Sequence, residues 1–238
     1  MSKRLLLISN STLHGTGYLD HCALEIGGFL GKGIEQVLFV PHARPSGITC
    51  DEYAEKVRKR FATMGYDVTS LHKTKDAKRA IRKAEAIFIG GGNTWELQGE
   101  LYRLQIVEDI RARVNGGAPY IGTSAGANVA CPTIMNTNDM PIRQVPSLKA
   151  LQLVPFQINP HYLDPDPNSR HQGETRETRL NEYLVFNKRP VVGMREGAML
   201  YVNDDHVMLK GSTGVRIFER RREPTEHMPV KYLDFLLG

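Results

Sequence analysis

Short apolar runs that do not alternate with polar residues constrain the fold of this chain more than any other feature. They lie at residues 5–8, 37–40, 86–89 and 120–121, and longer segments with helical spacing of apolar residues separate them. Strands of this composition are buried on both faces, as in a parallel sheet that crossover helices cover. The alternation of strand and helix therefore predicts an α/β fold with a mainly parallel central sheet.

Capping residues indicate where the intervening helices begin and end. Asp51 is expected to cap a helix that ends at Gly65, and Asp76 is expected to cap another that runs toward Lys83. A third helix is predicted over residues 95–104, after a glycine cluster.

The second half of the chain differs from the first in its composition and apolar pattern. Seven prolines interrupt residues 132–175, which predicts long loops on the sheet scaffold. The apolar runs 198–202 and 206–209 flank an Asn-Asp-Asp turn and predict a β-hairpin, and residues 215–218 predict one more strand. A chain of this length can form one core, so we expect a single domain over residues 1–238.

Composition and charge exclude several classes of protein. The net charge of +5 comes from 31 Lys and Arg against 26 Asp and Glu, and the two signs are interleaved, without the signature of a nucleic-acid-binding module. The first apolar run is too short for a signal peptide or a membrane span, and the three cysteines are far apart. We therefore expect a cytoplasmic protein that binds neither nucleic acid nor membrane. Because no metal-ligand motif such as H-E-x-x-H occurs, we also expect neither a metal nor a cofactor.

The strongest local motif is Gly-Thr-Ser-Ala-Gly at residues 122–126, which follows a predicted strand and precedes small residues suited to the start of a helix. This context is typical of a nucleophile elbow, in which flanking glycines let the serine sit in a tight strand-to-helix turn. Ser124 would be the nucleophile, and the N–H of Ala125 would face the oxyanion of a tetrahedral intermediate. The alternative is a small-residue turn that packs under a helix.

A glycine cluster at residues 90–92 follows another predicted strand and reaches the same edge of the sheet. Glycines there let backbone N–H groups approach a ligand closely. Since the second oxyanion donor of such hydrolases comes from another strand-to-helix loop, Gly92 or Gly91 is the candidate.

A nucleophilic serine needs a base, and the chain has eight histidines. His161 is the best placed because it follows a short apolar segment where loops on a parallel sheet meet substrate. Two carboxylates are candidates to orient it: Glu196, which follows the apolar residues 191–194, and Asp139, which precedes Met140 and Pro141. Each also has a plain alternative, a salt bridge with Arg195 for Glu196 and a turn residue for Asp139. Sequence spacing alone does not decide which of the two carboxylates orients His161.

A set of motifs resembles the peptidase E family, the aspartyl dipeptidases, in colinear order from about residue 5 to residue 196. The matching segments are Ser-Asn-Ser-Thr at 9–12, Gly-Gly-Gly-Asn-Thr at 90–94, Gly-Thr-Ser-Ala-Gly-Ala-Asn at 122–128, Cys-Pro-Thr-Ile at 131–134, Thr-Asn-Asp-Met-Pro at 137–141, Ile-Asn-Pro-His at 158–161 and Gly-Glu-Thr-Arg-Glu at 173–177. The resemblance weakens after about residue 202.

The resemblance implies a three-layer α/β/α sandwich like that of class I glutamine amidotransferases. It also implies a Ser124–His161–Glu196 arrangement, with Asp139 as a supporting residue. Arg176 matches the family arginine that binds the aspartate side chain of a small peptide substrate, and a guanidinium suits a carboxylate because it can form two parallel hydrogen bonds with it. One departure is Thr123, where bacterial members carry tryptophan.

Without the resemblance, Arg176 would be interpreted as a solvated residue of a charged helix face. The elbow alone also permits an esterase or a related amide hydrolase, and a third interpretation is a non-catalytic protein that binds an aspartyl ligand. Retention of a serine, a histidine and a carboxylate together argues against the last, since losing any one would cripple acyl transfer. Whether the protein is a monomer or a homodimer is left open.

Overall fold

The computed structural model describes residues 2–168, 170 and 172–238, and its central feature is an eight-stranded sheet. Five of its strands run parallel, as predicted, and the three at one end are antiparallel. In spatial order the strands are β12 (Lys231–Tyr232), β9 (His206–Gly211), β8 (Ala198–Asn203), β1 (Arg4–Ile8), β5 (Tyr120–Thr123), β4 (Ala86–Ile89), β2 (Gln36–Val40) and β3 (Asp67–Ser70).

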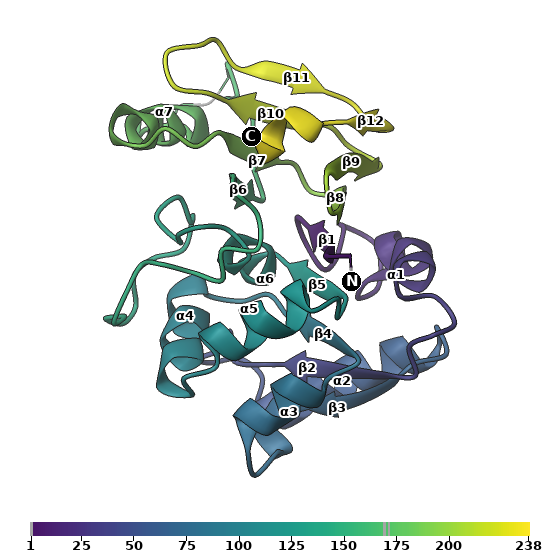
Figure 1. Ribbon diagram of the computed structural model, residues 1–238. Coiled ribbons are helices and arrows are strands. Elements are labelled where there is room, and N and C mark those ends of the chain that lie inside the picture. Colours follow the sequence, from purple (N-terminus) through teal and green to yellow (C-terminus); the bar gives the residue numbers. More distant parts are fainter. Residues whose placement is uncertain (1, 169, 171) are drawn as a thin grey trace.

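Helices cover both faces of this sheet, because its central strands are apolar on both sides (Figure 1). Leu5 and Leu7 of β1 belong to one buried cluster, and Leu6 and Ile8 belong to the other. The Leu6 face packs against α1 (Ala23–Leu30) and α2 (Cys50–Ala62). The Leu5 face packs against α3 (Ala77–Lys83), α4 (Thr94–Arg103), α5 (Val107–Asn115) and α6 (Ala125–Val129). The predicted three-layer α/β/α sandwich of the class I glutamine amidotransferase type is confirmed.

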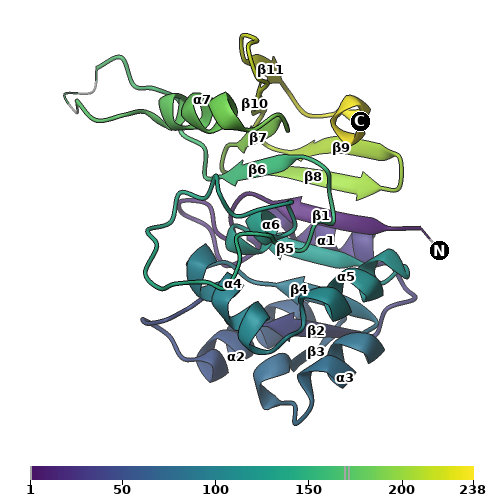
Figure 2. The ribbon, with the colours of Figure 1, turned by 60° about the vertical axis from the view of Figure 1, so that its left-hand side comes forward.

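A second, four-stranded sheet lies beyond β8 and was not predicted (Figures 1 and 2). It contains, in spatial order, β11 (Thr225–His227), β10 (Val215–Phe218), β7 (Val191–Met194) and β6 (Gln157–Pro160), of which β6 and β7 are parallel. The helix α7 (Arg176–Phe186) packs on it through a small apolar cluster that includes Leu180, Leu184 and Phe218. An apolar run predicts a strand but not the sheet that the strand joins.

Local sequence explains most element boundaries. Asp76 caps α3 by accepting a hydrogen bond from the Arg79 N–H, as predicted. The predicted cap of α2 at Asp51 is wrong, because Thr49 and Glu52 form a reciprocal capping box that starts the helix earlier. The hairpin of β8 and β9 is confirmed. The described residues also include three short 3₁₀ helices: Asp20–Cys22, Leu71–Lys73 and Asp234–Leu237.

Candidate active site

Ser124 occupies a sharp turn between β5 and α6, with φ +53° and ψ −111°. A non-glycine residue at positive φ is strained, which is typical of a nucleophile elbow. The flanking glycines are required: a Cβ atom on Gly126 would lie 2.2 Å from the Ile89 carbonyl oxygen, and one on Gly122 would lie 2.4 Å from the Gly126 carbonyl oxygen. Preceding Thr123 is fully buried. The spacing of this motif is therefore a steric requirement of the turn.

The glycine cluster after β4 lies against this elbow. A Cβ atom on Gly91 would lie 3.0 Å from the Ser124 Cβ, so a larger residue there would have to displace the serine by a few tenths of an ångström. Gly92 has φ +149° and packs against the Ala43 backbone. The Tyr53 hydroxyl donates a hydrogen bond to the Gly91 carbonyl oxygen over 3.3 Å, and this fixes the peptide group whose N–H belongs to Gly92. The backbone N–H groups of Gly91 and Gly92 donate no hydrogen bond to any described residue.

His161 joins the serine to a carboxylate. Its Nε2 lies 2.9 Å from the Ser124 Oγ, and its Nδ1 lies 2.7 Å from the Glu196 Oε1. A carboxylate can only accept a hydrogen bond, so Nδ1 carries the proton and Nε2 is left to accept one. The side chains of His161 and Glu196 are 41% and 47% exposed, which leaves the pair accessible to a small ligand.

Asp139, the other candidate, contacts a different element. Its Oδ2 accepts a hydrogen bond of 2.7 Å from the Thr94 N–H at the start of α4, and it lies 3.2 Å from the Thr137 hydroxyl. Glu196 is therefore the carboxylate that contacts the imidazole. Nor does Glu196 pair with Arg195, which instead binds Asp164 and Glu226.

Asparagines that the sequence reasoning did not assign hold the loop around Asp139. The Asn138 Nδ2 donates to the Pro160 carbonyl oxygen over 2.7 Å, directly before His161. The Asn159 Nδ2 donates to the Asn136 carbonyl oxygen over 2.8 Å. Asn138 and Asn159 lie inside the motifs given above, but the motifs do not predict what these two side chains contact.

Arg176 is the first residue of α7 and is half-buried. Burial and neighbouring Arg179 lower the pKa of its guanidinium, while the Asp139 carboxylate acts in the opposite direction. No hydrogen bond or ion pair joins this guanidinium to any residue of the described ranges. A half-buried cation without an internal partner is suited to bind an anion from solution.

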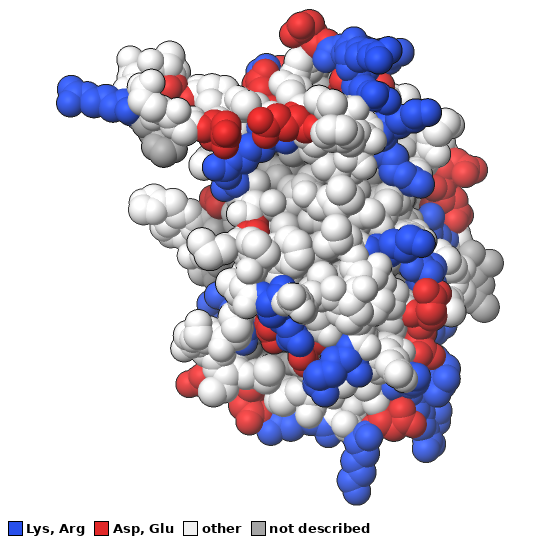
Figure 3. Space-filling view, turned by 90° about the vertical axis from the view of Figure 1, so that its left-hand side faces the viewer, with Lys and Arg blue, Asp and Glu red and all other residues white. Residues whose placement is uncertain are grey.

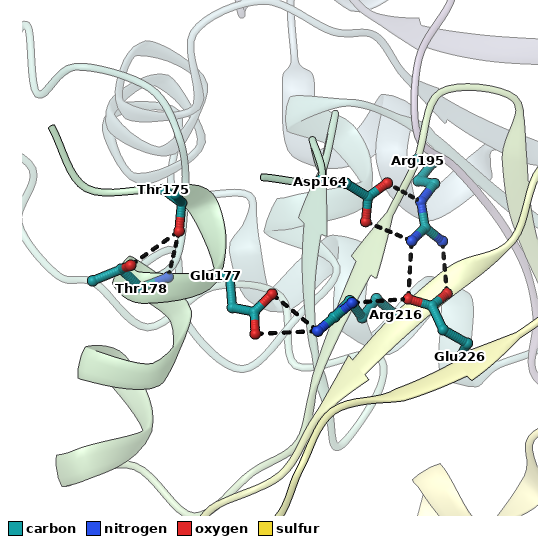
Figure 4. Close-up of polar contacts among 7 residues, drawn as sticks. All are labelled: Asp164, Thr175, Glu177, Thr178, Arg195, Arg216 and Glu226. Atoms are coloured by element: carbon teal, nitrogen blue, oxygen red, sulfur yellow. Dashed lines mark hydrogen bonds and ion pairs between the residues drawn. The ribbon is translucent and has the colours of Figure 1, made fainter. Parts of the chain in front are cut away.

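An ion-pair network fixes the helix that carries Arg176 (Figure 4). Arg216 of β10 contacts Glu177 of α7 at 3.0 Å and Glu226 of β11 at 3.3 Å. Glu226 also binds Arg195, which binds Asp164 in turn, and these contacts raise the pKa of Arg195. The network includes Glu177, which follows Arg176, and Arg195, which precedes Glu196. It therefore fixes the start of α7 relative to the turn that carries Glu196.

On the face shown in Figure 3, a broad uncharged area separates margins where basic and acidic side chains stand side by side. This distribution agrees with the interleaved charges of the sequence. None of the helices among the described residues has the length and apolar character that crossing a membrane requires. The described residues also contain no group of three or more His, Cys, Asp or Glu side chains that could hold a metal ion.

The chain is similar to known peptidases over most of its length. The model of Peptidase family S51 matches residues 5–210. Peptidase E of Streptomyces coelicolor is 48% identical over 222 residues, which are 93% of this chain and 90% of that protein. The Drosophila melanogaster protein named "Probable alpha-aspartyl dipeptidase" is 43% identical over 238 residues, which are 99% of this chain and 98% of that protein.

A crystal structure shares the fold at low sequence identity. The structure of a peptidase from an acI-B1 actinobacterium has a TM-score of 0.74 at 17% identity and covers 97% of this chain and 96% of its own. The resemblance that the colinear motifs indicate is therefore confirmed, and the chain belongs to peptidase family S51.

Proposed function

We propose that the protein is a serine dipeptidase that hydrolyses dipeptides with an N-terminal aspartate. The observation that carries the proposal is the hydrogen-bonded series Ser124–His161–Glu196. It is joined by Arg176 at the start of α7, whose guanidinium has no partner among the described residues. The names of the relatives, peptidase E and alpha-aspartyl dipeptidase, support the same activity.

In this mechanism the Ser124 Oγ attacks the carbonyl carbon of the aspartyl residue while the His161 Nε2 accepts its proton. The negative charge on the carbonyl oxygen would be stabilised by the N–H groups of Ala125 and of Gly92 or Gly91. His161 then gives the proton to the leaving amine, and an acyl-enzyme remains on Ser124. Glu196 holds the imidazole in the correct tautomer and stabilises its charged form.

Water completes the reaction. His161 removes a proton from a water molecule, which attacks the acyl-enzyme and releases aspartate, and Ser124 regains its proton. Asp139 acts as a supporting residue, because its bond to the Thr94 N–H fixes the loop between the glycine cluster and His161. The scheme uses no metal and no cofactor.

Specificity would come from Arg176. A guanidinium can hold the side-chain carboxylate of the substrate through two parallel N–H···O bonds, and it stays charged at any working pH. Its own lack of an internal partner among the described residues leaves those donors free. Residues 1–238 would form one catalytic domain, which would act in the cytoplasm as a monomer or a homodimer.

The test is release of free leucine from Asp-Leu and from Ala-Leu by the purified protein, with Ser124→Ala and added EDTA as controls. Hydrolysis of Asp-Leu alone, which EDTA leaves unchanged and Ser124→Ala abolishes, would support the serine mechanism and the acidic specificity. Turnover of a simple ester without turnover of Asp-Leu would instead favour an esterase. Binding of aspartate without any turnover would favour a non-catalytic protein.

A further inference from the structure

We infer that Ser9 and Asn10 are positioning residues that hold His161 and Glu196 at working distance from Ser124. The inference rests on the proposed function and adds two residues to which the motif comparison assigns no role. Both follow β1 directly, at the end of the strand that lies between β5 and β8. Both are buried, with exposures of 0% and 1%.

Ser9 bonds to the segment that carries the base. Its Oγ accepts a hydrogen bond of 3.0 Å from the His161 N–H and donates one of 2.8 Å to the Met194 carbonyl oxygen. Met194 is the last residue of β7, and His161 follows β6. One hydroxyl therefore ties the large sheet to both strands of the small sheet that end at the site.

Asn10 bonds to the turn that carries the carboxylate. Its Oδ1 accepts a hydrogen bond of 2.8 Å from the Gly197 N–H, and its Nδ2 donates one of 2.9 Å to the Thr12 carbonyl oxygen. Gly197 has φ +89°, and the turn closes through a 3.0 Å bond from the Ala198 N–H to the Arg195 carbonyl oxygen. Positive φ at this position suits a type II turn, which presents the preceding Glu196 at its corner.

The nucleophile is tied to the same segment. The Ser124 N–H donates a hydrogen bond of 2.9 Å to the carbonyl oxygen of Ile8, the residue before Ser9. Three consecutive residues thus hold the backbones around Ser124, His161 and Glu196. Because His161 and Glu196 follow strands of the small sheet and Ser124 follows a strand of the large one, their distances depend on how the two sheets are joined. Catalytic groups need placement to within about 0.5 Å, which such shared anchors can supply.

The critical experiment compares Ser9→Ala with Ser70→Ala, using Asp-Leu as substrate. Ser70 is a matched control, since it is a buried serine at the carboxyl end of β3 whose Oγ contacts His72 at 2.7 Å, away from the site. We expect Ser9→Ala to lower kcat by about 10- to 100-fold with KM nearly unchanged, because misplaced groups slow chemistry more than binding. Ser70→Ala should keep the kcat of the unmodified protein.

Two further variants distinguish positioning from general loss of structure. Ser9→Thr retains a hydroxyl at the same Cβ and should recover part of the kcat that Ser9→Ala loses. Asn10→Ala leaves the Ser9 bonds in place, removes the acceptor of the Gly197 N–H and should also lower kcat. An equal kcat for Ser9→Ala and Ser70→Ala, in folded protein, would overturn the inference.

A structural readout separates this inference from the proposed function. If the unmodified protein does not hydrolyse Asp-Leu, the proposed function fails, but the distance from the His161 Nε2 to the Ser124 Oγ can still be measured in crystals of Ser9→Ala. We expect that distance to increase from 2.9 Å by about 0.5 Å or more. A distance that stays unchanged would overturn the positioning role. If Ser9→Ala does not fold, the same measurement on Asn10→Ala decides it through the separation of Glu196 and His161.

Discussion

Glu196 and Asp139 are the two acidic residues that the sequence offers to orient His161, and their partners differ. Glu196 contacts the imidazole, whereas Asp139 accepts a backbone hydrogen bond from Thr94. We expect Glu196→Gln to lower kcat by roughly 10²- to 10⁴-fold, because the amide can no longer stabilise a charged imidazole. Asp139→Asn should lose far less, since its amide oxygen can still accept from Thr94. Steady-state kinetics on Asp-Leu compares the two, and a larger loss in Asp139→Asn would reverse their roles.

Arg176 is expected to control substrate choice more than folding. Arg176→Ala should reduce kcat/KM for Asp-Leu by about 10²-fold or more, because a substrate carboxylate would be left without its charged partner. Arg176→Lys should recover part of the loss, since it restores the charge without the planar pair of donors. The thermal unfolding midpoint should not change. An unchanged kcat/KM in Arg176→Ala would remove the residue from the proposed mechanism.

The sequence locates the residues that we propose to react, but it does not predict all of their contacts. Ser124 lies in a motif whose glycines are sterically required, so the motif itself carries the geometry. Sequence spacing could not decide between Glu196 and Asp139, because it does not show which loop approaches the imidazole of His161. The Ser-Asn-Ser-Thr segment belongs to the motifs that the sequence shows. However, Ser9 and Asn10 bond to residues that lie 152 to 187 positions later in the sequence, and no local pattern predicts contacts at that separation.

At the scale of elements, the turn between β5 and α6 depends on space that only glycine leaves. A Cβ atom on Gly126 would meet backbone atoms of Ile89 in β4, and these cannot rotate away. We expect Gly126→Ala to lower the free energy of unfolding by about 1–3 kcal/mol, as overpacking does. Urea denaturation measures the change.

Gly28 in α1 is the matched control for this substitution. A Cβ atom there has no neighbour within 4 Å, and the position is exposed. Gly28→Ala should raise the free energy of unfolding by about 0.5–1 kcal/mol, because alanine restricts the unfolded chain and favours helix. Equal effects of the two substitutions would contradict the steric argument.

Elements with a clear burial pattern were predicted, whereas short strands in polar or proline-rich sequence, such as β3 and β6, were not. The strands β2 and β4 are buried along nearly their whole length, so their apolar runs stand out in the sequence. The edge strand β3 reads Asp-Val-Thr-Ser and alternates between exposed and buried positions, which hides it among polar residues. The strand β6 lies within the proline-rich region and ends at Pro160, where sequence favours a loop.

At the scale of the whole molecule, partly buried histidines couple stability to pH. Burial lowers the pKa of His42, and likewise of His21 and His227, below the ordinary value of 6.5. Between those lowered values and 6.5 the unfolded chain binds more protons than the folded one, so the free energy of unfolding decreases as the pH falls through this window. A hydrogen bond to Asp234 raises the pKa of exposed His206, and this shift opposes the decrease in the free energy of unfolding.

We therefore expect a lower unfolding midpoint at about pH 5 than at about pH 7, and a smaller difference in His42→Gln. Differential scanning calorimetry at the two pH values measures both. Carboxylates whose pKa is lowered in the folded protein lose their contribution to stability only at more acidic pH. The His42→Gln variant therefore isolates the effect of a histidine in this range. An identical pH dependence in His42→Gln would show that this histidine is not among the groups responsible.

The position of β1 also governs when peptide hydrolysis can begin during translation. Ser9 and Asn10 leave the ribosome early, but their partners at Met194 and Gly197 are made 185 and 187 residues later. A nascent chain that stops before Met194 already contains Ser124, but it lacks Glu196 and the groups at Met194 and Gly197 that Ser9 and Asn10 bind. Prematurely terminated products should therefore be inert toward cellular peptides.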